Sequence, residues 1–502
     1  MDGYSFRSLR WWGLAVLTSL ACAALPYALG TLWLKASFGF DRAQYLALIS
    51  DSIHYWHETL NMARVPLDTG FYGYQETHAP LGRYGVHAPW VILVYALGVK
   101  LFGAASTLPI TLNAWLFGLA ILAYQAITRA RGIDMAALVA LCALYGPFQL
   151  GLAWIFPDML NVSLVVVLAA MARRALNDEG DRPFFWGMLA VSIPMVLIRK
   201  SWLPLLPLFV ALHFMKHRRV WKSYYLATAF AALTTWAAYT YATAPYHFAE
   251  TLQFFKFTDL FRGGMEQFSK MVSYSATSLL HIHREMFYGN LFGLTILAAS
   301  LAGAATSLLR RRLGEALFLL LTPLTAFLYI FGHFFNGIIA VRHLSAVFLL
   351  GLMTSVLGRQ KTLYALFLVA NLILYPAFLE AFQKLTLPEY AASGVHEALA
   401  ELRPILAREM VHTAGGDPWL NTVATQDYYR SLLALPPGFA FNAVRPQHPS
   451  FKPPLRSRYV LLSDPELFLP LFPAPPRLIL RTFDGAYLYE NTGAASQAKD
   501  TQ

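Results

Sequence analysis

The sequence predicts a mainly α-helical protein that crosses a membrane many times and carries a small α/β domain outside it. Of 502 residues, 57% are hydrophobic and 13% are charged, whereas an average soluble chain has about 25% charged residues. The apolar residues gather in repeated runs of roughly 20, enough to cross a hydrocarbon core of about 30 Å. The composition becomes more polar only in the tail from residue 384. These features exclude an ordinary soluble globular protein.

Eleven apolar segments are long enough to be candidate spans. They cover residues 11–34, 107–128, 133–153, 155–172, 183–198, 200–215, 222–244, 287–309, 314–333, 337–357 and 361–383. Another apolar run, 88–103, is shorter and contains Lys100, so we expect a re-entrant or interfacial segment there. The first run contains Ala21-Cys22-Ala23, which resembles a signal-peptidase site, but the run continues to Leu34 and favours an uncleaved anchor.

Short basic clusters predict which loops face the cytoplasm. They are Arg7/Arg10, Arg129/Arg131, Arg173/Arg174/Arg182, Lys216/Arg218/Arg219/Lys222, Arg310/Arg311/Arg312 and Arg359/Lys361. All fall on one side if 88–103 does not cross fully, which predicts a cytoplasmic N-terminus and an external tail. The net charge of +11 then reflects topology and requires no nucleic-acid partner. Cys22 and Cys142 lie in apolar runs, so we expect packing roles and neither a disulfide framework nor a cysteine metal site.

Three segments are predicted to lie outside the membrane: the loops 35–88 and 245–286, and the tail 384–502. We therefore divide the chain into a membrane domain, 1–383, and a soluble α/β domain, 384–502. The tail has a helical pattern at 395–410 and strand-like runs at 458–462 and 477–483, the last followed by a turn at Asp484-Gly485.

The first external loop contains an amphipathic helical pattern between residues 42 and 64. One apolar stripe is formed by Leu46, Ile49, Ile53, Trp56 and Leu60. The opposite face holds Asp51, His54, Tyr55 and Glu58. We expect this helix to lie along the membrane surface with its acidic face toward water. The alternative is a polar face that is merely solvated.

The rest of this loop is also rich in polar and aromatic residues. It adds Tyr72, Tyr74, Glu76, His78, Arg83 and His87, a density that favours a site over a linker. Asp41 is a second candidate acid, although it could equally cap the helix that follows it.

Two basic pairs are predicted at the outer membrane surface, against the inside rule. They are Arg199-Lys200, between two spans, and Arg342-His343. Basic side chains at the membrane edge can bind the phosphate of a lipid ligand. The alternative is that they only extend toward the headgroups of the surrounding bilayer. Asp158 begins a span after Pro157, where a purely structural role at the positive end of the helix dipole is also open.

Other chemistry has little support in the sequence. His281-x-His283 is a weak metal signal, and the sequence has no Walker A, Rossmann glycine or GxSxG motif, so ATP hydrolysis and serine-esterase chemistry are not indicated.

In layout, the chain resembles the GT-C superfamily of polytopic glycosyltransferases, which includes protein mannosyltransferases and aminoarabinose transferases. An uncleaved first span is followed by a large external loop with an acid. The segments HAPWVILVYALGVKLFG, FPDMLNVSLVVVLAAMARR and LIRKSWLPLLPLFV and a soluble outer tail come after it. DSIHYWHE, GFYGYQE and YGVHAPW also resemble bacterial membrane proteins associated with this superfamily.

The resemblance implies an inverting glycosyltransferase in a bacterial inner membrane that uses a polyprenyl-phosphate sugar. The acceptor would be the hydroxyl of a cell-envelope glycan, lipid or protein. The carboxylate that acts on the acceptor would be Asp51, with Asp41 second, because the chain lacks an acidic pair close after the first span. The implied substrate-binding residues are His54, Tyr55, Glu58, Tyr74, Glu76, His87 and Asp158, and those for the donor phosphate are Arg199, Lys200, Arg342 and His343. The resemblance implies no particular cofactor, and Glu58, Glu76 and His87 could bind the acceptor sugar or a divalent cation.

Two other classes of protein remain as alternatives. A polymerase or ligase of lipid-linked glycans usually has its key loop late in the chain, whereas here the first loop is the richest. A lipid or polysaccharide transporter usually has internal repeats and charges at the membrane midplane, and neither is evident in this sequence.

Overall fold

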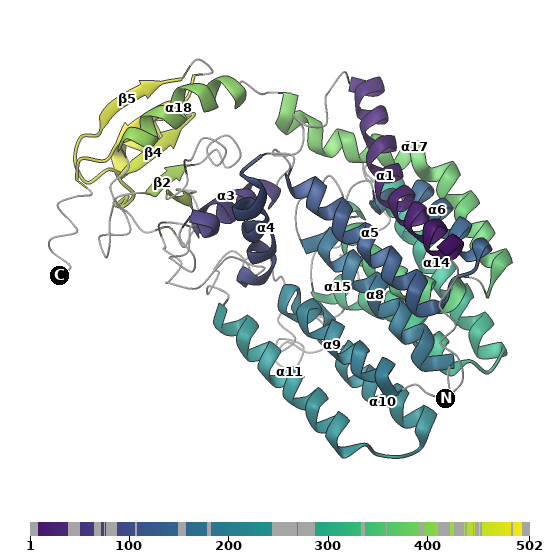
Figure 1. The fold of residues 1–502 in the computed structure, drawn as a ribbon. Coiled ribbons are helices and arrows are strands. Elements are labelled where there is room, and N and C mark those ends of the chain that lie inside the picture. Colours follow the sequence, from purple (N-terminus) through teal and green to yellow (C-terminus); the bar gives the residue numbers. More distant parts are fainter. Residues whose placement is uncertain are drawn as a thin grey trace. The chain divides into compact units, whose positions relative to one another are not determined.

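A computed structural model describes most helices and strands of the chain. The described residues are 9–38, 51–64, 72–74, 76, 88–105, 108–148, 157–177, 182–242, 269, 287–332, 337–357, 359–391, 395–409, 422–425, 436, 439–444, 446, 451, 454–482 and 485–493. The chain divides into two compact units (Figure 1). The helical unit comprises 1–44, 109–238 and 251–385, and the sheet unit comprises 45–108, 239–250 and 386–502.

The helical unit consists of apolar helices of 13 to 31 residues. Its helices are α1 (Leu9–Phe38), α5 (Leu108–Thr128), α6 (Gly132–Leu144), α8 (Pro157–Asn177), α9 (Arg182–Ile198), α10 (Leu205–His217), α11 (Lys222–Ala242), α14 (Phe287–Leu309), α15 (Leu313–Gly332), α16 (Gly337–Gly351) and α17 (Lys361–Ala391). A 3₁₀ turn, η2 (Lys200–Trp202), precedes α10, and a π-helical turn, η3 (Leu352–Val356), follows α16. The helices coincide closely with the predicted apolar segments.

The prediction of eleven full crossings is not confirmed by the described residues. Four described helices are long and apolar enough to cross a membrane, within α1, α5, α8 and α14. Others, such as α6 and α10 with 13 residues each, rise only about 20 Å at 1.5 Å per residue. The segment 88–103, expected not to cross, forms α4 (Ala88–Phe102), which belongs to the sheet unit.

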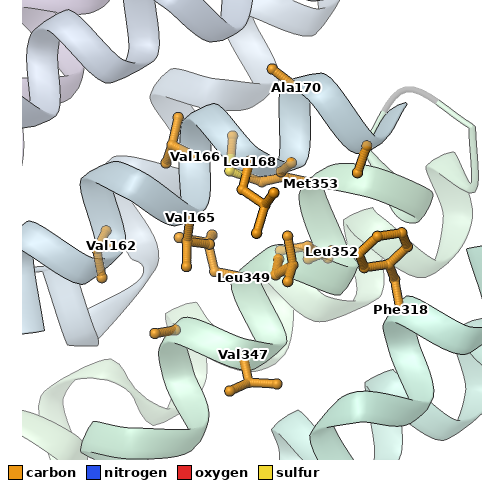
Figure 2. Close-up of a cluster of buried hydrophobic side chains, with 14 of the residues drawn as sticks. Val162, Val165, Val166, Leu168, Ala170, Phe318, Val347, Leu349, Leu352 and Met353 are labelled. Atoms are coloured by element: carbon orange, nitrogen blue, oxygen red, sulfur yellow. The ribbon is translucent and has the colours of Figure 1, made fainter. Parts of the chain in front are cut away.

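Helix α8 lies at the centre of the helical unit. Its apolar residues are buried around most of the helix circumference, as is typical of a core helix, and include Val165, Val166 and Leu168. They pack in one cluster with Leu349 of α16 and Met353 of η3 (Figure 2). The run of alanines at 169, 170 and 172, all fully buried, leaves room for neighbouring helices to approach closely.

Polar side chains inside the helical unit bond to neighbouring backbone groups. Gln125 of α5 donates to the carbonyl of Ala15 at 3.1 Å and to Ser19 Oγ at 2.9 Å, both on α1. Trp11 Nε1 donates to the carbonyl of Ala130 at 3.0 Å. Because unsatisfied polar groups are costly in lipid, these bonds fix α1 against α5 and the start of α6. Cys22 and Cys142 are buried in the same core.

The sheet unit contains a six-stranded mixed sheet in the order β1-β3-β2-β4-β6-β5. The strands are β1 (Tyr72–Tyr74), β2 (Thr422–Thr425), β3 (Ala440–Ala443), β4 (Tyr459–Leu462), β5 (Arg477–Arg481) and β6 (Tyr487–Glu490). The first four in spatial order pair in parallel, and β4-β6-β5 are antiparallel. Figure 1 shows α18 (Val395–Glu409) beside this sheet.

The predicted tail elements are confirmed. The helix at 395–410 is α18, the runs at 458–462 and 477–483 are β4 and β5, and the turn before β6 places Gly485 at φ +86°. Such a backbone conformation is easy only for glycine.

One strand of this sheet comes from the first external loop and not from the tail. Tyr72–Tyr74 pair in parallel with Phe441–Ala443 of β3. A strand of three residues has no periodicity that a sequence can reveal, so this pairing was not predicted. Because paired strands lie in one sheet, this part of the first loop and the tail form one folded unit.

A close helix contact in the helical unit yields a prediction. A Cβ added at Gly351 would lie 3.0 Å from the carbonyl oxygen of Phe318 and 3.1 Å from the Cα of Leu319, and backbone atoms cannot move aside cheaply. We expect Gly351→Ala to destabilise the protein by about 1–3 kcal/mol, measured as a lower apparent Tm in detergent. Gly13→Ala is the control, since nothing lies within 4 Å of its added Cβ. Equal Tm values for the two variants would contradict the close packing of α15 and α16.

Candidate functional site

Several predicted site residues lie outside what the structure describes. Asp41 and His87 are not among the described residues. Asp51 is the first residue of α3 (Asp51–Arg64), but its side chain is not described. The same holds for the side chains of His54 in α3, Tyr74 in β1, Lys200 in η2, and Arg342 and His343 in α16. Their functional roles stay predictions.

Helix α3 does not have the solvated acidic face that the amphipathic pattern predicts. Tyr55 and Glu58, expected on the water-facing side, are buried, and so is Trp56 on the opposite side. On one side, Met62 packs against Ile92 and Ala96 of α4. The burial of described side chains on both sides distinguishes α3 from a helix that lies on a surface with one face in water.

His57 and Asn61 join α3 to the start of β3. The carbonyl of Phe439 accepts a hydrogen bond from His57 Nε2 at 2.7 Å. The Asn61 amide lies 2.9 Å from the same nitrogen and donates to the same carbonyl at 3.5 Å. Burial, opposed by this hydrogen bond and reinforced by the charge of Arg403, lowers the pKa of His57 to about 4. A neutral imidazole therefore links the helix to the sheet.

Glu76 forms the second link between the first loop and the tail. Its backbone N–H donates to Asn442 Oδ1 at 2.8 Å. Its carboxylate Oε2 accepts from the Ser457 backbone N–H at 3.0 Å, from Ser457 Oγ at 3.1 Å and from the Arg456 N–H at 3.3 Å. The residue has φ +60°, a conformation that costs a side-chain-bearing residue roughly 1–3 kcal/mol. These bonds hold the unusual backbone in place.

The buried carboxyl of Glu76 has an unusual proton affinity. Burial raises its pKa to about 7, although the hydrogen bonds from Ser457 and Arg456 and the Arg456 charge act in the opposite direction. The contacts of Glu76 Oε2 anchor the loop, and its predicted role in substrate binding stays a prediction. Sequence reasoning missed the partners that hold it, Asn442 and Ser457, because a single polar residue in a tail carries no pattern.

In the helical unit, Asp158 and Arg199 form a buried ion pair. Arg199 Nη2 lies 2.5 Å from Asp158 Oδ1, and the side chains are only 9% and 11% exposed. Asp158 stands in the first turn of α8, and Arg199 lies between α9 and η2. The predicted donor-phosphate residue is thus next to a predicted substrate-binding carboxylate, which orients its guanidinium.

Asn161 is a polar residue of the same helix that sequence reasoning did not single out. It lies one turn after Asp158 on the same face of α8 and is 2% exposed. Among the described residues, neither its side-chain nitrogen nor its oxygen has a hydrogen-bond partner. A buried amide in that condition needs a water or ligand group.

A divalent cation was considered for the first loop. The described residues contain no group of three or more His, Cys, Asp or Glu side chains arranged to hold a metal ion. Glu76 is engaged with Ser457 and Arg456, so its Oε2 does not fit a ligand role.

No family model and no curated protein sequence matches this chain. Among solved structures, the Archaeoglobus fulgidus oligosaccharyltransferase with zinc and sulfate gives a TM-score of 0.49 at 13% identity, covering 95% of this chain and 73% of that one. AglB of the same organism, with an inhibitory peptide and dolichol-phosphate, gives 0.48 at 12%, covering 97% and 75%. ArnT from Cupriavidus metallidurans, bound to undecaprenyl phosphate, gives 0.45 at 14%, covering 97% and 99%.

The Glu76 anchor predicts a pH dependence of stability. Its folded-state pKa is raised from 4.5 to about 7, so its contribution is fully present below pH 4.5 and is lost as the pH rises through 7. We expect the apparent Tm of the wild type, relative to Glu76→Gln, to fall across this range by the equivalent of about 3 kcal/mol or less.

The comparison with Glu76→Gln isolates this carboxyl. His57, whose pKa is lowered from 6.5 to about 4, acts in the opposite direction, losing stability as the pH falls, but it is present in both proteins and cancels in the difference. A flat difference between pH 4.5 and 8 would show that the Glu76 carboxyl is not buried.

The Asp158–Arg199 pair predicts strong coupling between the two residues. Because both side chains are nearly buried, we expect Asp158→Asn or Arg199→Gln to cost about 3–5 kcal/mol. The double variant should cost clearly less than the sum, since it leaves no single buried charge. The measurement is a double-mutant cycle on apparent Tm in detergent, and strict additivity would show that the pair contributes nothing.

Proposed function

We propose that this chain is an inverting glycosyltransferase that moves a sugar from a polyprenyl-phosphate donor to a hydroxyl of a cell-envelope acceptor, at the outer face of a bacterial inner membrane. The observation that carries the proposal is the anchoring of the first external loop. In superfamily members that the sequence resembles, this loop supplies the carboxylate that acts on the acceptor. In this chain the loop is fixed to the tail at His57 and Glu76.

That anchoring supports a catalytic role for the start of α3. A general base must be held within hydrogen-bond reach of the proton that it removes, and a site on a packed helix is more exact than one on a free loop. Asp51 begins α3, less than two turns before His57, which bonds to the sheet. The proposed base therefore belongs to a helix with buried side chains on both sides.

In the proposed reaction, the Asp51 carboxylate takes the proton of the acceptor hydroxyl as its oxygen attacks the anomeric carbon. The bond between that carbon and the phosphate oxygen breaks, and the polyprenyl phosphate leaves with the electron pair. One displacement inverts the anomeric centre. Negative charge develops on the leaving phosphate, so basic side chains near it stabilise the transition state.

The basic residues at the outer surface divide into two proposed roles. Arg199 is held by Asp158, which fixes its guanidinium and offsets part of its charge. Lys200 and Arg342 are proposed to contact the phosphate directly, together with His343. Asn161, with its buried amide, is proposed to bond a polar group of the sugar or phosphate.

The test is transfer by purified full-length protein with a labelled polyprenyl-phosphate sugar and an envelope acceptor. We expect Asp51→Asn to lower kcat by at least about 100-fold, the contribution of a general base, while the apparent Tm stays near that of the wild type. Asp41→Asn is the matched control for the loss of one nearby carboxylate and should keep most of the activity. Full activity of Asp51→Asn would remove Asp51 as the base, and loss in Asp41→Asn alone would assign the role to Asp41.

A further inference from the structure

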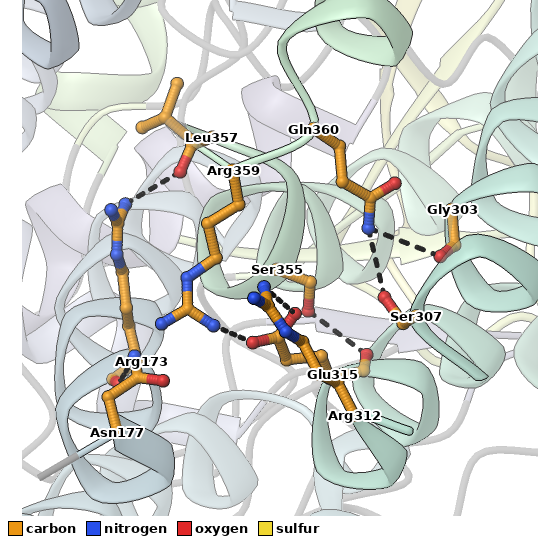
Figure 3. Close-up of polar contacts among 10 residues, drawn as sticks. All are labelled: Arg173, Asn177, Gly303, Ser307, Arg312, Glu315, Ser355, Leu357, Arg359 and Gln360. Atoms are coloured by element: carbon orange, nitrogen blue, oxygen red, sulfur yellow. Dashed lines mark hydrogen bonds and ion pairs between the residues drawn. The ribbon is translucent and has the colours of Figure 1, made fainter. Parts of the chain in front are cut away.

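A second polar cluster lies at the opposite end of the helical unit from Asp158, at its predicted cytoplasmic side. Arg312, just before α15, and Arg359, between η3 and α17, both pair with one acid there, and Arg173, near the end of α8, bonds to the Leu357 carbonyl beside them (Figure 3). Glu315 in the first turn of α15 is the acid. We refer to these four residues as the arginine cluster.

The arginine cluster is held by contacts that fix its geometry. Arg359 Nη1 pairs with Glu315 Oε1, and Arg312 Nη1 lies 3.8 Å from Oε2. Arg173 Nη1 donates to the Tyr124 hydroxyl at 3.0 Å and to the carbonyl of Leu357 at 2.9 Å. The Glu315 side chain is 5% exposed and is therefore buried. The side chains of Arg312 and Arg359, which pair with it, are partly exposed.

The π-helical turn η3 takes part in this arrangement. Leu357 N–H bonds to the carbonyl of Leu352, five residues back, and Ser355 Oγ donates to the carbonyl of Glu315 at 3.1 Å. Leu357, the residue after this turn, presents its carbonyl to Arg173, and Arg359 lies two residues further along the chain. Such π turns within helices are frequent at functional sites.

Charge is not balanced within the arginine cluster. Arg312 and Arg359 pair with the one Glu315 carboxylate, and Arg173 bonds to neutral oxygens, which leaves two positive charges in the cluster. Burial, together with the charges of Arg173 and Arg312, lowers the pKa of Arg359 to about 10, so Arg359 is still cationic at neutral pH and is repelled by the other two. Asp134, in the first turn of α6, has its own partner in Arg131 at 3.6 Å. An anion that bridges the arginines would relieve this repulsion.

Arg312 and Arg359 are exposed enough for a ligand from the surroundings of the protein to reach them. Arg312 is 44% exposed and Arg359 is 23% exposed. Each guanidinium has more N–H donors than these contacts use, and arginine pairs bidentately with phosphate oxygens. All three belong to basic clusters that the sequence assigns to the cytoplasmic side, where basic pockets between helices bind anionic lipid headgroups.

We propose that the arginine cluster binds a phosphate-bearing anion, supplied by the headgroup of an anionic phospholipid in the cytoplasmic leaflet. The phosphate would bridge Arg312 and Arg359, with Glu315 and the Leu357 carbonyl orienting the guanidinium groups. Bound lipid would tie α8, α15 and α17 together and would stabilise the folded protein by mass action. This role is independent of glycosyl transfer at the outer face.

The test uses full-length protein, delipidated in a neutral detergent and titrated with phosphatidylglycerol in mixed micelles. Phosphatidylcholine and inorganic phosphate at equal concentration are the comparison arms. We expect phosphatidylglycerol to raise the apparent Tm by several degrees, phosphatidylcholine to have no such effect, and phosphatidylglycerol to be retained in native mass spectra. Arg312→Gln should bind phosphatidylglycerol about tenfold more weakly, the loss expected for one charge-assisted contact.

Matched variants separate a site from general charge attraction. Arg310→Gln removes the same charge from an exposed residue of the same loop and should keep wild-type binding. The double variant Glu315→Gln with Arg359→Gln removes the other arginine proposed to bind the phosphate, together with the carboxylate that pairs with it, so no unpaired charge stays buried. This variant should abolish the Tm shift. Equal weakening in Arg310→Gln and Arg312→Gln, or a wild-type shift in the double variant, would overturn the proposal. An equal shift with inorganic phosphate would overturn the lipid as the source of the phosphate.

Discussion

The contact between β1 of the first external loop and β3 of the tail is the interaction on which the proposed active site depends. Three parallel-paired residues, the Glu76 carboxylate on Ser457 and the His57 bond to Phe439 combine segments more than 360 positions apart. Each bond is modest alone, worth roughly 0.5–1.5 kcal/mol for neutral partners. Their joint effect is to turn a long connecting loop into part of a folded unit, and thereby to fix the helix that begins with Asp51.

The links between the first loop and the tail bury two ionisable side chains, His57 and Glu76. Burial shifts the pKa of each toward its uncharged form. His57 is neutral at physiological pH because burial lowers its pKa to about 4, and Glu76 is half-protonated near neutrality because burial raises its pKa to about 7. Neither link therefore requires a full charge to stay buried at neutral pH, which would be costly. The same rule explains the Asp158–Arg199 pair in the helical unit, where two charges are buried together.

The basic residues of this protein serve several distinct purposes. Arg199 is oriented by the Asp158 carboxylate, whereas Arg312 and Arg359 share Glu315 and Arg173 bonds to the Tyr124 hydroxyl and the Leu357 carbonyl. Arg310 and Arg311 are exposed and fit the simpler role predicted for short basic loops, which is to orient the helices in a membrane. A count of charges cannot tell these cases apart, because the distinction lies in what each guanidinium touches.

The sequence by itself determined the class of protein and the helical segments, because the length and composition of an apolar run are local properties that the bilayer selects. It also located α18, β4, β5 and the turn at Gly485, whose periodicity and turn residues are local signals. It did not determine the pairing of Tyr72–Tyr74 with β3, the burial of side chains on both sides of α3, the anchoring role of Glu76, or the pairing of Arg312 and Arg359 with Glu315. Those depend on contacts between residues far apart in the chain, which only tertiary structure creates.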